Sequence, residues 1–102
     1  MMDESLQGLI DIDRTIHEPA RLIIMAILSA VEEADFLYLL QATGLTRGNL
    51  SSHLTRLETA GFVSIDKSFA GKMPRTIGRL TDEGRQALAT YRQQMGAVIG
   101  AD

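Results

Sequence analysis

A tight turn followed by a helix with one apolar stripe constrains the fold of this chain more than any other segment; it spans residues 44–61. Gly44 suits the left-handed position that ends a helix, and the hydroxyl of Thr46 can cap the next one. One buried face is predicted by leucines at helical spacing, namely Leu50, Leu54 and Leu57. The sequence therefore predicts two helices joined by a turn, with the second helix ending at Gly61.

The opposite face of the second helix is small, polar and free of acidic residues. At about 100° per residue it carries Gly48, Ser52, Thr55, Arg56 and Thr59. Glutamate and lysine are better helix formers and are usual on a face that only meets water. Short hydroxyl side chains, one glycine and one arginine instead suit a helix pressed into a nucleic-acid groove. A polar surface helix without a partner is the alternative.

Residues on and beside this face are the candidates for nucleic-acid contacts. They are Arg47, Gly48, Asn49, Ser51, Ser52, Thr55 and Arg56. The N-terminal half of such a helix enters a groove deepest, so Ser52, Thr55 and Arg56 are the best candidates for base edges. Arg47, at the helix start, is expected to contact phosphate. For Gly48, close approach of the backbone and the tolerance of helix starts for glycine are equal alternatives.

The next segment predicts a β-hairpin over residues 62–80. Residues 62–69 alternate loosely, residues 70–74 are rich in turn formers, and residues 75–80 return as a second strand. Basic side chains are expected in or beside the hairpin tip: Lys67, Lys72, Arg75 and Arg79. Such residues contact the nucleic-acid backbone or the minor groove, and position the protein without specifying sequence. A solvated hairpin tip is the alternative.

In this order the motifs resemble the winged-helix transcriptional regulators of the MarR/ArsR type, nearest to their small single-domain subgroup. The resemblance is weakest before residue 15 and after residue 92. It rests on Pro19-Ala20-Arg21-Leu22, Asp35-Phe36, the run from Gly44 to Leu54, Leu57-Glu58, Ala60-Gly61-Phe62-Val63, Pro74-Arg75-Thr76 and Leu80-Thr81-Asp82-Glu83-Gly84-Arg85. The resemblance implies a homodimer that binds double-stranded DNA and regulates transcription, with repression as the usual action of the family.

The expected fold is mainly α with a small β-hairpin wing, in a single domain over residues 1–102. The helix-turn-helix is placed at residues 35–60 and the wing at 62–80. A largely apolar helix from Pro19 to about Val31 is expected at the centre. Extra helices over residues 5–16 and 82–99 flank this core.

The flanking helices each carry a stripe of large apolar residues, which predicts a dimer interface. Its members are Leu6, Leu9, Ile10, Leu88, Tyr91, Met95 and Val98. A two-fold dimer presents two recognition helices to a pseudo-palindromic operator with half-sites about one helical turn apart. The alternative is that the last helix folds back over its own core.

Charge is distributed unevenly along the chain, although the net charge is −3. Residues 1–43 hold two basic and eight acidic residues, whereas residues 44–102 hold eight basic and five acidic ones. Within residues 47–79 the count is six basic to two acidic. Electrostatic attraction acts over about 8–10 Å at physiological salt, so this local excess is compatible with DNA binding. An asymmetry this mild also arises by chance.

Other classes of function find little support in the sequence. The chain has no cysteine and two separated histidines, so neither thiolate sites nor a metal or cofactor site is expected. Ser51, Ser52 and His53 are neighbours that point apart on a helix, so no catalytic set and no enzyme is expected. His53 is expected to be packed or at a boundary.

The longest apolar run is too short to span a bilayer, and no leader is visible, which favours a cytoplasmic protein without a membrane partner. No effector pocket can be identified. The rival function is a winged helix that binds only proteins.

Overall fold

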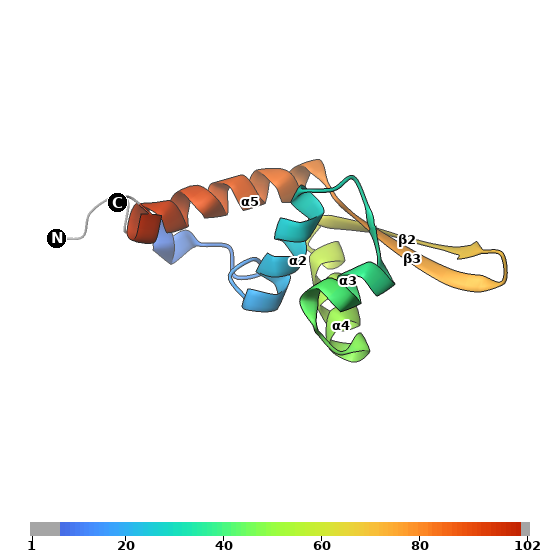
Figure 1. The fold of residues 1–102 in the computed structure, drawn as a ribbon. Coiled ribbons are helices and arrows are strands. Elements are labelled where there is room, and N and C mark those ends of the chain that lie inside the picture. Colours follow the sequence, from blue (N-terminus) through green and yellow to red (C-terminus); the bar gives the residue numbers. More distant parts are fainter. Residues whose placement is uncertain (1–6, 101–102) are drawn as a thin grey trace.

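The computed structural model describes residues 7–100 as a winged helix with an elongated shape, with principal extents of 60 × 25 × 22 Å. In chain order the elements are η1 (Gly8–Asp11), α2 (Pro19–Ser29), β1 (Ala34–Asp35), α3 (Phe36–Thr43), α4 (Arg47–Thr59), β2 (Val63–Ala70), β3 (Met73–Leu80), α5 (Asp82–Met95) and η2 (Gly96–Gly100). The β2–β3 hairpin projects from one end of the helical body, and α5 runs toward the other end (Figure 1). The predicted fold class is confirmed.

Side chains cap the starts of the helices, at Thr46 as predicted. The side chain of Thr46 accepts from the backbone N–H of Asn49 at 3.1 Å, and Asp35 accepts from Tyr38 at 2.8 Å. Thr81 accepts from Gly84 at 2.9 Å. Each cap satisfies a backbone donor that the first helical turn leaves free. The turn between α3 and α4 is made by Gly44 in the left-handed conformation, with φ of +72°.

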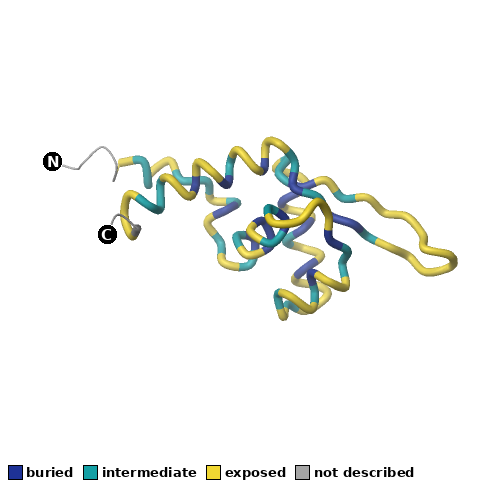
Figure 2. The backbone as a smooth tube through the Cα atoms, turned by 45° about the horizontal axis from the view of Figure 1, so that its top comes forward, coloured by how far each residue is buried: buried dark blue, intermediate teal, exposed yellow. Residues whose placement is uncertain are grey.

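The hydrophobic core lies where α2, α3, α4, the base of the hairpin and the first turns of α5 meet (Figure 2). The predicted leucine stripe of α4 is buried there. The core residues are Ile16, Ile24, Met25, Leu28, Ala34, Leu39, Leu50, Leu54, Leu57, Val63, Leu80, Leu88 and Tyr91. The outward face of α4 is thereby held on a rigid support.

The sheet has three antiparallel strands in the order β1-β3-β2, and the short strand β1 was not expected from the sequence. β1 pairs Asp35 with Ile77 of β3. In the hairpin, Val63 pairs with Leu80 at the base and Ala70 with Met73 at the tip. The two-residue turn begins at Gly71, with φ of +66°, which is a conformation that favours glycine.

The N-terminal segment differs from the predicted helix over residues 5–16. Among its described residues, Gln7 and η1 are helical, and the chain becomes extended at Ile12. The carboxylate of Asp13 accepts from the backbone N–H groups of Thr15 at 2.8 Å and Ile16 at 3.1 Å. This local turn competes with helical hydrogen bonding and explains why apolar spacing alone misled the prediction.

The last helix begins where predicted but changes character before residue 99. α5 ends at Met95, and a π-helical turn, η2, follows from Gly96. The first turn of α5 packs very closely on Phe62, the residue before β2. Gly84 is buried there, and a Cβ at this position would lie 2.9 Å from the carbonyl carbon of Phe62 and 2.9 Å from Cδ1 of Leu80. Only glycine fits at this contact.

Candidate nucleic-acid interface

The outward face of α4 is open to solvent along its length. All its predicted contact residues are exposed: Arg47, Gly48, Asn49, Ser51, Ser52, Thr55 and Arg56. The first turn of α4 contains no acidic residue, and its unpaired N–H groups give this end a partial positive charge. A helix end of this kind favours a phosphate group, and Arg47 stands beside it.

The inner side of α4 is fixed by a buried arginine. Arg21 of α2 donates through Nε to the carbonyl oxygen of Thr15 at 2.6 Å, and its Nη1 lies 3.2 Å from Nδ1 of His53. Half-buried His53 is therefore a boundary residue that ties α4 to α2, as predicted. Burial raises the pKa of Glu18, but a hydrogen bond from the backbone N–H of Arg21 and the nearby charges of His53 and Arg21 outweigh it, so this pKa is lowered.

Three basic side chains of the wing are exposed toward its outer half. Lys72 lies in the turn, Arg75 pairs across the hairpin with Ser68, and Lys67 pairs with Thr76. Within residues 7–100, the ion pairs involve none of these three residues. Their charges are therefore available to an anionic partner.

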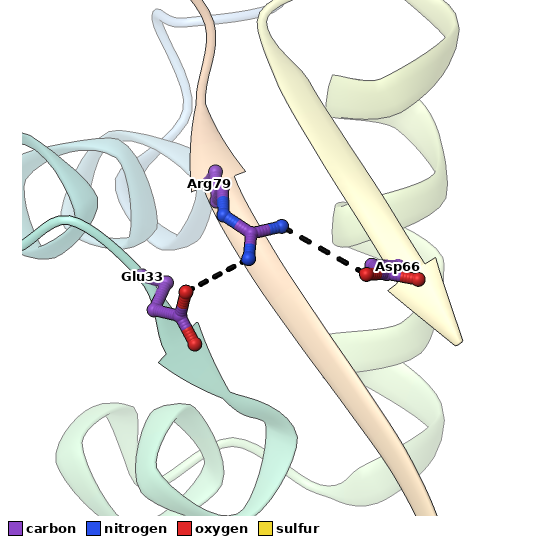
Figure 3. Close-up of polar contacts among 3 residues, drawn as sticks. All are labelled: Glu33, Asp66 and Arg79. Atoms are coloured by element: carbon purple, nitrogen blue, oxygen red, sulfur yellow. Dashed lines mark hydrogen bonds and ion pairs between the residues drawn. The ribbon is translucent and has the colours of Figure 1, made fainter. Parts of the chain in front are cut away.

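Arg79 lies at the base of the wing, opposite Ser64, and not beside the tip as predicted. Its Nη2 is 2.8 Å from Oε1 of Glu33, and its Nη1 is 4.0 Å from Oδ2 of Asp66 (Figure 3). Two carboxylates thus compensate its charge. The physical role visible in the structure is to tie β3 to the segment before β1 and to β2.

A cleft joins the start of α4 to the outer part of the wing. It has a volume of about 460 Å³ and is lined by Asp35, Phe36, Leu37, Arg47, Met73, Pro74, Arg75 and Thr76. A smaller cleft of about 140 Å³ lies between Ser51 and Thr55 of α4 and Lys67 of the wing. Each cleft thus brings a residue of the predicted α4 set together with a wing cation, and each also contains one acidic side chain, Asp35 in the larger cleft and Glu58 in the smaller one.

Two apolar side chains at the wing tip were missed in the sequence. Phe69 is 72% exposed and Met73 is 70% exposed. The signal was available, because a phenylalanine and a methionine next to a hairpin turn cannot reach a core. They lie among the basic residues just described.

The predicted dimer residues separate into two groups. Leu88 and Tyr91 are 2% and 6% exposed and belong to the core of this chain, so their placement in an interface was wrong. α5 packs against α2, and the Tyr91 hydroxyl lies 3.0 Å from Nδ1 of His17, just before α2. Ile10 and Val98 are exposed, Leu9 and Met95 are half-buried, and Leu6 lies outside the described residues.

Two kinds of feature are absent from residues 7–100. None of the helices in residues 7–100 is long and apolar enough to cross a membrane. No group of three or more histidine, cysteine, aspartate or glutamate side chains within that range is arranged to hold a metal ion.

Comparisons with known proteins agree with this geometry. The chain is 41% identical over 78 residues to an uncharacterized protein of Methanocaldococcus jannaschii, covering 76% of this chain and 85% of that protein. The solved structure of a transcriptional regulator homologue from Pyrococcus horikoshii OT3 has a TM-score of 0.86 and 32% identity over 97% of both chains.

A PadR family transcriptional regulator from Eggerthella lenta DSM 2243 shares the fold, with a TM-score of 0.66 and 22% identity over 93% of this chain and 92% of that one. None of these findings assigns the MarR/ArsR subtype, which stays a prediction. The family model of the winged helix DNA-binding domain matches residues 20–99. The chain therefore belongs to the winged helix DNA-binding domain family.

Proposed function

We propose that the protein is a transcriptional regulator that binds specific double-stranded DNA as a homodimer and represses by occupying promoter DNA. The observation that carries this proposal is that the fold sets α4 beside the basic wing, so that Arg47 and Arg75 line one cleft and Thr55 and Lys67 line another. In a DNA complex, α4 lies in the major groove and reads base edges through Ser52, Thr55 and Arg56. Lys67, Lys72 and Arg75 contact the adjacent backbone and minor groove.

The homodimer is supported by exposed apolar side chains of η1 and η2, two segments that lie at the end of the molecule opposite the wing (Figure 1). Ile10, Val98 and Ile99 are exposed there, and Gln94 of α5 donates to the carbonyl oxygen of Gly8, which holds η1 against α5. Pairing two copies through this end would cover the apolar surface and leave both wings at the outer ends of the assembly. That arrangement fits a pseudo-palindromic operator.

The rest of the assignment follows from this role. A repressor needs no catalytic set and works in the cytoplasm, where the DNA of a prokaryotic relative lies. The function of the protein is then binding alone, and we propose that it is not an enzyme. No effector is assigned.

A salt-dependent binding assay tests the proposal. Fluorescence anisotropy with a pool of random-sequence duplexes should show binding at low salt that weakens steeply as salt rises, by a slope of about 0.9 per phosphate contact on a log–log plot. Arg56→Ala and Arg75→Ala should weaken binding. Arg92→Ala removes the same charge from an exposed position of α5 and should not. Absence of binding at low salt would refute DNA binding and favour a protein-interaction module.

Selection of bound sequences from the same pool then tests specificity. We expect a two-fold symmetric consensus. If no sequence is enriched, the protein has no specific operator, although electrostatic binding to DNA would still stand.

A further inference from the structure

The tip of the wing is apolar on both of its faces. Strand alternation and the hairpin register place Phe69 beside Pro74 on one face, and Met73 beside Ala70 on the other. Phe69 and Met73 are the exposed large apolar side chains of the hairpin. The tip lies beyond the helical body, so these side chains contribute nothing to the core (Figure 2).

On each face of the hairpin, a basic residue lies two positions farther from the tip than the apolar residue. Lys67 precedes Phe69 by two residues, and Arg75 follows Met73 by two, while Lys72 occupies the turn between the strands. No ion pair within residues 7–100 includes these cations. An apolar edge surrounded by free positive charge matches a partner with a negative rim and an apolar interior. The phosphates and stacked bases of a duplex have that chemistry.

The position of the tip favours DNA over other anionic surfaces. Met73 and Pro74 line the same cleft as Arg47, at the start of α4. A duplex whose major groove holds α4 therefore presents the neighbouring minor groove to the wing. The hairpin keeps its ladder up to the pair Ala70 and Met73, so its end is a narrow two-residue turn.

We propose that Phe69 and Met73 form a wedge that enters the minor groove beside the half-site, partly unstacks one base step and bends the duplex. The proposal rests on the proposed function. Phenylalanine, methionine and proline are side chains that act as such wedges in other DNA-bending proteins. The cations beside them hold the flanking phosphates. Flexible pyrimidine–purine steps, which unstack most easily, should be preferred at that position although no side chain reads their base edges.

The test separates the apolar contribution from the charges. The probe is a duplex selected from a random pool, labelled at its two ends for energy transfer and carrying 2-aminopurine at successive steps. Wild-type protein should shorten the end-to-end distance and raise 2-aminopurine fluorescence at one step on each side of the centre. The double variant Phe69→Ala/Met73→Ala should lose both signals and bind roughly tenfold more weakly, with an unchanged salt slope.

Matched variants control for charge and for folding. Lys72→Gln should lower the salt slope by about 0.9 and keep the bend. Phe69→Leu/Met73→Leu retains apolar bulk and should keep most of the bend. Because Phe69 and Met73 are exposed, the double alanine variant should unfold at the wild-type temperature, which shows that loss of bending is not loss of fold.

Several outcomes would overturn the wedge. A double alanine variant that bends and unstacks the duplex like wild type would refute it and leave the proposed function standing. A wild-type protein that binds no duplex at low salt would refute both. Sedimentation with phosphatidylserine vesicles checks the other anionic surface. Vesicle binding that needs Phe69 and Met73, together with duplex binding that does not, would assign the tip to lipid.

Discussion

The close contact at Gly84 predicts that a single methyl group there should destabilise the protein. An alanine Cβ would lie 2.9 Å from both the carbonyl carbon of Phe62 and Cδ1 of Leu80, and closer still to the carbonyl oxygen of Phe62. Carbon atoms pack best at about 3.5–4.0 Å, so α5 and the segment before β2 must separate by roughly 1 Å. Two of the atoms in the way are backbone atoms, which a change of rotamer cannot move.

The size of the effect follows from two opposing contributions. Overpacking a buried site costs about 1–3 kcal/mol, and the upper end applies because backbone must move. Alanine regains about 1 kcal/mol over glycine inside a helix. The free energy of unfolding of Gly84→Ala should therefore fall by about 2 kcal/mol, which in a domain of this size lowers the melting temperature by roughly 10 °C.

Thermal and urea unfolding followed by far-ultraviolet circular dichroism measure this change, at one protein concentration for all variants. The matched control is Gly48→Ala in the first turn of α4, where an added Cβ meets nothing within 4 Å. This control should be as stable as wild type or slightly more so. Equal or greater stability of Gly84→Ala than of wild type would refute the close contact between α5 and Phe62.

Other predictions concern DNA, assembly and pH. Arg56→Ala should cost about 1–3 kcal/mol and relax sequence preference, whereas Arg75→Ala should weaken all duplexes alike and lower the salt slope by about one; titrations on selected and scrambled duplexes would show the reverse pattern if the roles are exchanged. Val98→Glu should yield monomers in sedimentation at micromolar concentration and weaken operator binding together; a monomeric wild type, or a half-site bound as tightly as a full site, contradicts the dimer. The pKa of Glu18 is lowered on folding, so its contribution to stability is present above its unfolded pKa and is lost as pH falls through the folded one. Urea unfolding at a series of acidic pH values should therefore show that the free energy of unfolding depends less on pH in Glu18→Gln than in wild type. Identical pH profiles of the two proteins would contradict this account.

Local signals made the helices and the hairpin predictable from sequence. Thr46, Asp35 and Thr81 each bond to a backbone N–H three residues ahead, so the caps depend on neighbours in the chain. The strand β1 was missed because two residues are too few to show the alternation of apolar and polar side chains that marks a strand. Asp13 redirected the N-terminal segment through its own carboxylate, which outweighed the apolar spacing before it.

Non-local partners account for the errors at the candidate site. An apolar stripe such as that of Leu88 and Tyr91 has the same spacing whether its own core or a second copy covers it. Arg79 follows Arg75 by four residues on the same strand and looks like another wing cation in the sequence, but its carboxylate partner Glu33 is 46 residues away. The exposed face of α4 was predictable because the leucines that define its opposite face are part of the same helix.

The wing and α5 meet at a junction formed by Thr81. This single residue separates β3 from α5, and its N–H and hydroxyl donate to the carbonyl oxygens of Phe62 at 3.0 Å and Gly61 at 2.7 Å. The same hydroxyl oxygen accepts from the backbone N–H of Gly84, so one side chain links the first turn of α5 to the last residues before β2. These hydrogen bonds therefore fix the angle between the hairpin and α5. In the proposed dimer, the distance between the two wings would then depend on the angle at which the two copies meet.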